Sequence, residues 1–180
     1  MRNFGISILF AGLCGCGGAT LQEPRTFDLG LNAPSVPVPP VRIGLVRAVA
    51  PFDGADMHYR LAFRNPAEIA AFASSRWAAS PAEMLRKQIL RGAGDKAGRC
   101  VIYIEIQEFT QVFASKEASD ARVELRASLA NPAGNASRGL TIVEANAGPE
   151  AASGVAALAR AVDRAIGEIG RWIASQPDCR

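Results

Sequence analysis

Hydrophobic and polar residues alternate along several stretches of the chain, and this two-residue period predicts β-strands. The strongest alternation runs from Arg99 to Ala114, where Ile102, Ile104 and Ile106 point to one side. The pattern slips near Gln107, so we expect a β-bulge at that point. A long strand with one apolar face needs a partner layer to cover that face.

Two more alternating stretches follow, Arg122–Leu129 and Leu140–Ala145, with turn-forming residues from Asn131 to Asn135 between them. Consecutive strands joined by short connections usually pair, so these three stretches predict an antiparallel meander. Earlier in the chain we expect shorter strands at Thr26–Leu29, Val41–Val49, Met57–Phe63 and Glu68–Phe72. The proline-rich stretch Leu31–Pro40 is expected to be an extended connection.

Two stretches have the 3.6-residue period of amphipathic helices. The first covers about residues 80–92 and opens with Ser80, Pro81 and Glu83, which together form a capping box with proline at the first helical position. The second covers about residues 150–175. An apolar helix stripe is commonly laid on a sheet, so we expect a two-layer α/β (α+β) sandwich. Its sheet is mostly antiparallel or mixed, and both helices cover one face.

Composition excludes several classes of function. The 180 residues include 20 basic and 17 acidic side chains, with no basic run that would mark a nucleic-acid surface. The single histidine, His58, rules out a multi-histidine metal site, and no glycine-rich phosphate loop follows a predicted strand. Glu105 and Glu108 face opposite sides of their strand unless a bulge intervenes. We therefore expect no enzyme, catalytic residue, metal, cofactor or nucleic-acid partner.

The amino terminus has the layout of a bacterial export signal, because Arg2 precedes a short apolar run from Phe4 to Leu13. This run is too short to span a bilayer, which takes about 20 residues. Leu13-Cys14-Gly15-Cys16 resembles the lipobox of bacterial lipoproteins, in which a cysteine thiol receives a diacylglyceryl group after which the new amino terminus is acylated. The alternative is an ordinary signal peptide that contains cysteine.

Cys16 is the predicted lipid attachment site (S-diacylglycerol and N-palmitoyl), since the residue before Cys14 is the bulky Leu13. The chain then divides into a signal peptide at residues 1–15, a lipidated flexible tether at 16–25 and a single domain at 26–176. The tether from Gly17 to Arg25 reaches at most ~30 Å. Gly17, rather than aspartate, follows the lipidated cysteine. In enterobacteria-like sorting this favours the outer membrane over the alternative, the inner membrane, with the domain in the periplasm.

Cys100 and Cys179 remain after processing, and export would place them in an oxidising compartment where a disulfide persists. Cys100 opens the longest predicted strand and Cys179 lies in the tail after the last helix. A bridge would pin that tail to the sheet. The alternative is a buried Cys100 with a free Cys179, because the sequence does not show whether the two Cα atoms lie within ~7 Å.

The stretch from Val41 to Leu90 resembles the ABC-type transport auxiliary lipoproteins, the partners of mammalian-cell-entry (MCE) lipid transport systems, including the paraquat-inducible type. The resemblance continues over Glu105–Phe113 and the closing helix. Phe27 stands where the family often has tyrosine. The matching residues are Val46, Ala50-Pro51-Phe52-Asp53, Tyr59-Arg60, Glu68-Ile69, Phe72, Arg76-Trp77-Ala78, Pro81, Met84-Leu85, Glu105, Glu108-Phe109, Gln111, Phe113 and Trp172-Ile173.

The resemblance implies a non-catalytic lipoprotein that works beside an ABC permease and ATPase and an MCE-domain protein, moving phospholipid or other hydrophobic molecules across the envelope. It is also compatible with a homo-oligomer. Tyr59 and Trp77 are candidate binding residues, although a tryptophan just before a helix cap is more often part of the core. The alternative function is a stand-alone envelope lipoprotein that binds a lipid or another protein, such as a cell-wall enzyme activator.

Overall fold

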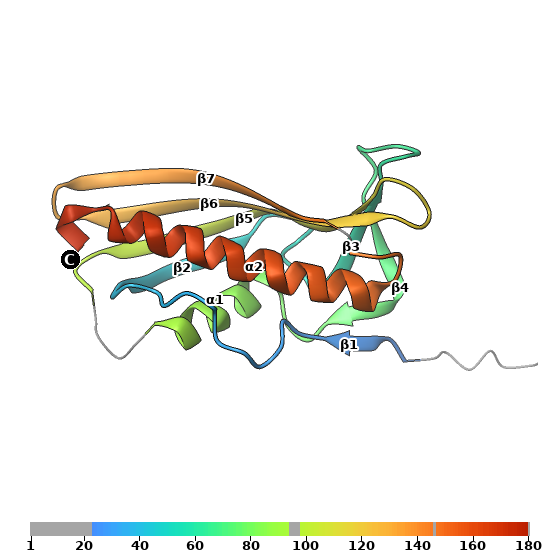
Figure 1. Cartoon of the computed structure of the whole chain (residues 1–180), viewed down its shortest axis with the longest axis horizontal. Helices are drawn as coiled ribbons and strands as arrows, with labels where there is room; N and C mark the ends of the chain where they lie inside the picture. Colours follow the sequence, from blue (N-terminus) through green and yellow to red (C-terminus); the bar gives the residue numbers. More distant parts are fainter. Residues whose placement is uncertain (1–22, 94–97, 146, 180) are drawn as a thin grey trace, which may run out of the picture.

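A mixed sheet with two helices on one of its faces makes up the computed structural model, which describes residues 23–93, 98–145 and 147–179 (Figure 1). The elements, in chain order, are β1 (Arg25–Phe27), β2 (Arg42–Ala48), β3 (Asp56–Leu61), β4 (Ala70–Trp77), α1 (Pro81–Gly92), β5 (Val101–Phe113), β6 (Ser119–Asn131), β7 (Gly134–Glu144), α2 (Ala151–Ala174) and the short 3-10 helix η1 (Pro177–Cys179).

Strand β5 is the centre of the sheet. The strand order of the sheet is β1-β4-β3-β5-β6-β7, and β2 also pairs with β5. Along one side β5 pairs antiparallel with β6, and along the other it pairs in parallel with β2 in its first half and with β3 in its last residues. The predicted meander of β5, β6 and β7 is confirmed, and β7 is left as an outer strand of the sheet.

The core lies between the sheet and the helices. Ile102, Ile104 and Ile106 of β5 are at most 2 % exposed and face the helix layer. Helix α2 packs against β5, β6 and β7, and α1 packs against β2 and β5. Figure 1 shows both helices on the same side of the sheet. The predicted two-layer sandwich is therefore confirmed.

Helix α1 begins as its sequence predicts. The Glu83 backbone N–H donates to Ser80 Oγ at 3.3 Å, and the Ser80 N–H donates to Glu83 Oε2 at 3.1 Å. Pro81 follows at the first helical position, where no backbone donor is needed. Trp77, just before this cap, is 1 % exposed and packs against Phe109, so its predicted place in the core is confirmed.

Among the predicted strand boundaries, two are wrong by five residues or more. Strand β4 runs to Trp77 rather than ending at Phe72, and β7 begins at Gly134 rather than at Leu140. The added residues are mostly small or polar and carry little strand preference of their own. They become strand because β1 pairs with the end of β4 and β6 pairs with the whole of β7. Long-range pairing overrides local preference there.

The proline-rich segment from Leu31 to Pro40 lies along both helices. The Val38 N–H donates to the Gly92 carbonyl at 3.0 Å, and the Ser35 N–H and hydroxyl donate to the Asp163 carboxylate at 2.7 and 2.6 Å. A Cβ at Gly92 would lie 3.0 Å from Val38 Cγ2, so glycine permits this close approach. The segment thereby joins α1 to α2.

Candidate functional site

The predicted site residues fall in two regions. Cys16 lies outside the described residues. Cys100 and Cys179, separated by 79 positions in the sequence, are joined by a disulfide with a Cα–Cα distance of 5.2 Å. Both cysteines are buried, Cys100 directly before β5 and Cys179 in η1. The bridge therefore ties the tail after α2 to the central strand.

His58 of β3 packs against an aromatic ring rather than against a nucleophile. Its imidazole makes an edge contact with Phe52, with ring centroids 5.5 Å apart. Burial lowers the pKa of His58 below its usual value, and the nearby Asp56 carboxylate opposes that effect without cancelling it. Among the described residues, no group of three or more histidine, cysteine, aspartate or glutamate side chains is arranged to hold a metal ion.

The two carboxylates of β5 that the sequence separates are brought to the same face of the sheet. The strand register shifts between Ile106 and Glu108, which confirms the expected bulge. The extra residue changes the alternation, so Glu105 and Glu108 both lie on the face of β5 turned away from α2, which we call the open face. Each is already engaged by an arginine, Glu105 by Arg47 and Glu108 by Arg60.

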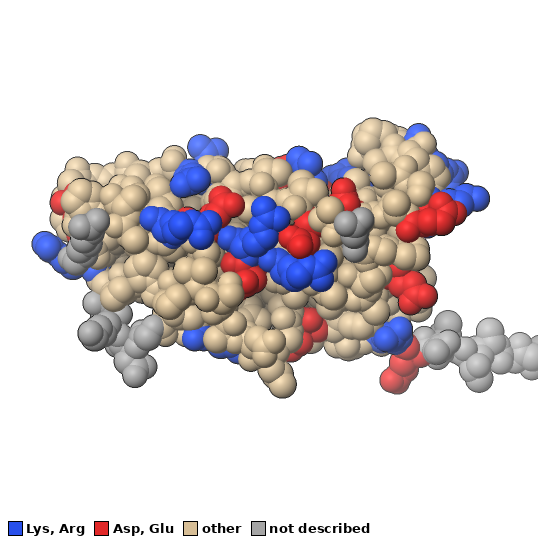
Figure 2. All heavy atoms as spheres, in the orientation of Figure 1, with Lys and Arg blue, Asp and Glu red and all other residues tan. Residues whose placement is uncertain are grey.

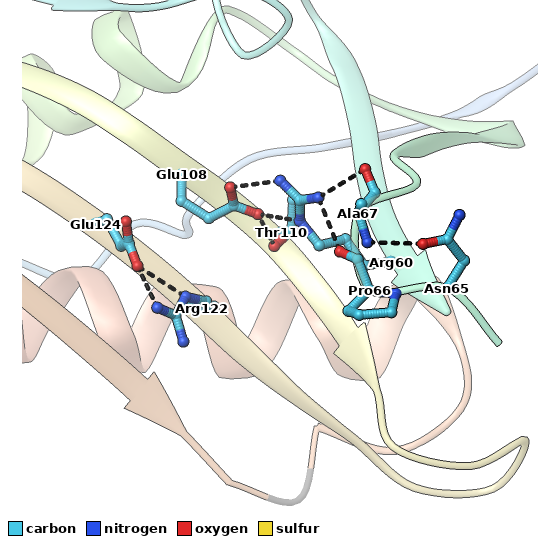
Figure 3. Close-up of polar contacts among 8 residues, drawn as sticks. All are labelled: Arg60, Asn65, Pro66, Ala67, Glu108, Thr110, Arg122 and Glu124. Atoms are coloured by element: carbon cyan, nitrogen blue, oxygen red, sulfur yellow. Dashed lines mark hydrogen bonds and ion pairs between the residues drawn. The ribbon is translucent and has the colours of Figure 1, made fainter. Parts of the chain in front are cut away.

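The pair Arg60–Glu108 is the most enclosed charged group on the open face (Figure 3). Arg60 Nε donates to Glu108 Oε1 at 2.7 Å, and Nη2 donates to Oε2 at 2.8 Å. The Thr110 hydroxyl donates to the same Oε1 at 2.6 Å. The side chains of Arg60 and Glu108 are only 19 % and 10 % exposed. This two-point geometry is the strongest form of an arginine–carboxylate contact.

The same arginine fastens the connection between β3 and β4. Arg60 Nη1 donates to the carbonyls of Pro66 and Ala67 at 3.2 and 3.5 Å. The Ala67 N–H in turn donates to Asn65 Oδ1 at 3.1 Å, which closes the turn (Figure 3). Arg60 therefore links β3, β5 and the β3–β4 connection.

The charges of this pair are mutually stabilised. Burial raises the pKa of Glu108, but hydrogen bonds from Arg60 and Thr110, with the positive charges of Arg60 and Arg122, outweigh it and hold the pKa below its ordinary value. The hydrogen bond with Glu108 raises the pKa of Arg60. Both groups are therefore charged at neutral pH.

We expect Glu108→Gln to lower the free energy of unfolding by about 2–3 kcal/mol at neutral pH, because it removes charged hydrogen bonds and leaves Arg60 half-enclosed without a counter-ion. A carboxyl group whose folded pKa is depressed stabilises the fold above its unfolded pKa of about 4.3, and this contribution is lost as the pH falls through the folded pKa. The difference in unfolding free energy between the parent and Glu108→Gln should therefore shrink in acid. Urea unfolding at several pH values measures it.

Glu124→Gln is the matched control. Glu124 pairs with Arg122 on the same face, but their side chains are 31 % and 42 % exposed. Exposed ion pairs contribute at most about 1 kcal/mol, so this variant should unfold nearly as the parent does. Equal losses from both substitutions, or a gap that does not narrow in acid, would contradict the role assigned to the enclosed pair.

The open face also carries apolar side chains in contact with solvent. Leu45 is 60 % exposed and Tyr103 is 44 % exposed, and they line a shallow hollow with Arg47, Glu105 and Arg126. A Cβ at Gly44 would lie 2.7 Å from the Tyr103 ring, so the ring rests on the backbone of β2. The hollow is open and mixed in character, as a protein-docking surface would be.

A narrower cleft lies beneath the proline-rich segment. It has a volume of about 290 Å³. Its lining combines apolar residues, among them Leu29, Pro34 and Ile166, with the polar Gln88 and Asp163. This volume is at the lower limit of small-molecule sites, which start at about 300 Å³. The Asp163 carboxylate already accepts hydrogen bonds from Ser35, so part of the polar lining of the cleft is satisfied within the chain.

The outer side of α2 presents mixed charge. Figure 2 shows basic and acidic side chains interspersed on the face that carries this helix. Arg160 and Arg164 both bind Glu144 of β7, each at 3.0 Å. Hydrogen bonds from Arg164 and then Arg160 hold the pKa of Glu144 below its ordinary value. No helix among the described residues is long and apolar enough to cross a bilayer.

The fold and these surfaces define a class: a mixed α+β sandwich with one open sheet face and paired surface charges. Two solved structures share this fold, each with a TM-score of 0.66. One is protein XCC0632 from Xanthomonas campestris, described under the family model DUF330; it is 21% identical over 78% of this chain and 92% of its own. The other is described as an uncharacterized protein and is 11% identical over 84% of this chain and 99% of its own. No protein-family model and no curated protein matches the chain.

The enclosed Arg60–Glu108 pair is the feature that sequence reasoning missed. A signal for it exists, because the polar residues Gln107, Glu108, Thr110 and Gln111 are interspersed with the apolar residues Ile106, Phe109, Val112 and Phe113 in a strand that is otherwise rich in core residues. Buried polar groups need partners, so such an interruption predicts a buried contact. The identity of Arg60 as the partner comes only from the parallel pairing of β3 with β5.

Proposed function

We propose that this protein is a non-catalytic envelope lipoprotein, anchored through Cys16 in the outer membrane, and an auxiliary component of an MCE-type ABC transport system. Its domain faces the periplasm and docks onto the MCE-domain protein or the permease–ATPase complex. The transport system moves phospholipid or another hydrophobic molecule. Holding and positioning a partner is the task assigned to this chain.

The observation that carries the proposal is the disulfide between Cys100 and Cys179. Such a bridge persists in exported proteins and is rare in the bacterial cytosol. It agrees with the lipobox pattern that ends at Cys16. The first strand begins at Arg25, so the tether holds the domain within ~30 Å of the anchor.

The surfaces of the domain support a docking role over a reaction. Glu105, Glu108 and Glu144 are each bound by arginine, so these carboxylates already have partners within the chain. Leu45 and Tyr103 instead offer exposed apolar area on the open face. Aromatic and apolar groups surrounded by charge are typical of protein interfaces. Fold likeness adds no function of its own, since one fold serves many functions.

Cross-linking in the native host, followed by purification of the full-length lipoprotein and mass spectrometry, tests the proposal. We expect an MCE-domain protein or an ABC permease or ATPase among the cross-linked partners. Leu45→Glu and Tyr103→Glu should reduce that recovery severalfold, and Leu90→Glu, on the exposed side of α1, is the matched control. The neighbouring genes offer a first check, because permease, ATPase and MCE-domain genes should lie beside this one.

Recovery of a cell-wall enzyme, with no transport component and with an isolated gene, would favour a stand-alone envelope lipoprotein instead. If the open-face variants and the α1 control recover the same amount of a transport partner, the partner assignment would stand. The assignment of the open face as the docking surface would then be wrong.

A further inference from the structure

Strand β7 is an outer strand whose second edge faces no other strand of the described sheet. It covers 11 residues and pairs with β6 without any shift of register from Asn131–Gly134 to Ala121–Glu144. Its sequence has no proline between Gly134 and Glu144. Proline, bulges and charged side chains are the usual devices that protect a long edge from another strand, and β7 has charged side chains nearby but neither proline nor a bulge.

The register identifies which backbone groups of β7 point outward. Gly134 and Asn131 close a two-residue turn, which makes them a hydrogen-bonded pair. In an antiparallel ladder such pairs alternate with pairs whose backbone groups point away from each other. The outward groups of β7 therefore belong to the odd-numbered residues, Asn135, Ser137, Gly139, Thr141 and Val143.

Two observations agree with this assignment. Arg164 Nη1 of α2 donates to the Val143 carbonyl at 3.2 Å, so that carbonyl faces away from β6. The five odd-numbered residues are all exposed, including Gly139, which has only backbone to expose. Nothing lies within 4 Å of a Cβ built at Gly139. The outward N–H and C=O groups of Asn135, Ser137, Gly139 and Thr141 have no strand partner in the described sheet and can pair with an added strand.

The side chains around this edge are predominantly basic. Arg138 belongs to β7, and Arg160 and Arg164 reach it from α2. On β6, Arg126 lies opposite Gly139 and the acidic Glu124 lies opposite Thr141. Side chains of the three arginines that pair with carboxylates are 47 to 55 % exposed, whereas their partners Glu144 and Glu168 are 20 % and 31 % exposed. Solvent at this edge therefore meets more positive than negative charge.

We propose that the free edge of β7 binds an extended, acidic segment of a partner protein as an additional strand. Backbone hydrogen bonds from Ser137, Gly139 and Thr141 would hold the segment, and carboxylates would meet the arginines on either side. A second copy of this chain is the less suitable occupant, because pairing two β7 edges would bring two basic surfaces together. The inference concerns this edge alone and does not depend on the Cys16 anchor or on a transport partner.

The test uses purified full-length protein and a short dye-labelled peptide of alternating valine and glutamate. We expect the peptide to bind, as followed by fluorescence anisotropy. Hydrogen exchange should slow at the amides of Ser137, Gly139 and Thr141. A peptide with lysine in place of glutamate should bind about tenfold or more weakly, and one with alternate N-methylated amides should not pair with the edge.

The matched variants are Thr141→Pro and Thr141→Val. Proline removes one outward N–H, which β6 does not use, so the strand is retained and peptide affinity should fall about tenfold. Valine keeps that N–H and should leave affinity unchanged. The double variant Arg138→Gln and Arg164→Gln should bind the glutamate peptide more weakly than the parent does, and should bind an uncharged peptide equally well.

Three results would overturn the inference. The N-methylated peptide could bind as tightly as the unmodified valine–glutamate peptide. That result would exclude strand addition, and it requires no change to the protein. The lysine peptide could bind equally, which would exclude charge recognition. The protein alone could dimerise with its β7 amides protected, and Thr141→Pro could dissociate it, which would make a second copy the occupant.

Discussion

Replacing both Cys100 and Cys179 by alanine is expected to lower the free energy of unfolding by about 4.5 kcal/mol. The two residues are 79 positions apart, so the bridge closes a long loop and removes much of the freedom of the unfolded chain. The loop contains all of β5, β6, β7 and α2, that is, the central strand, the meander and the main helix. Stability of this domain is of the same order as the expected loss.

Urea unfolding of the parent and the double variant measures this loss. The reductant dithiothreitol should lower the unfolding free energy of the parent toward that of the double variant. The double variant is the matched control, because dithiothreitol should leave its unfolding free energy unchanged. Peptide mapping after alkylation should find both cysteines protected in the unreduced parent. Free Cys179 thiol in that map, or a loss below about 1 kcal/mol, would contradict the bridge and restore the alternative of a frayed, unpaired tail.

Cys16→Ala is expected to move the protein from the membrane fraction to the soluble fraction almost completely. One acyl chain binds a bilayer only marginally, and each buried CH₂ contributes about 0.8 kcal/mol, so firm attachment needs several chains on one residue. No helix of the described chain is suited to span the membrane in their place. Fractionation of cells that express the full-length chain measures the shift.

Two neighbouring substitutions serve as controls for the anchor. Cys14→Ala should stay in the membrane, because the proposed processing before Cys16 would remove Cys14 with the signal peptide. Gly17→Asp should keep the lipid but move the protein to the inner membrane in a host with enterobacteria-like sorting. A Cys16→Ala protein that still sediments with membranes would overturn the lipid anchor, whatever the partner proves to be.

Local pattern was enough to predict most elements of this fold. The alternation of Ile102, Ile104 and Ile106 places one face of β5 in the core, and the capping box at Ser80 starts α1 where it is found. Such signals depend on residues close in sequence, because side-chain direction and helix capping are local properties. Even the bulge in β5 could be predicted from a slip in the alternation.

Elements without local preference could not be bounded in this way. The last residues of β4 and the first of β7 form strand only because neighbouring strands supply their hydrogen bonds. The same holds for the candidate sites. Glu105 and Glu108 share a face through the bulge, and Arg60 meets Glu108 because β3 lies beside β5 in parallel.

The sequence by itself determined most of the secondary structure, the two-layer arrangement and the expectation of an exported, lipid-anchored chain. These follow from periodicity, capping and the order of residues at the amino terminus. Only the tertiary structure decided that Cys100 meets Cys179, which carboxylates are bound by arginine, and that β7 has a free and basic edge. Those features join residues far apart in the chain, and contacts at such separation are set by how strands and helices pack rather than by any local pattern.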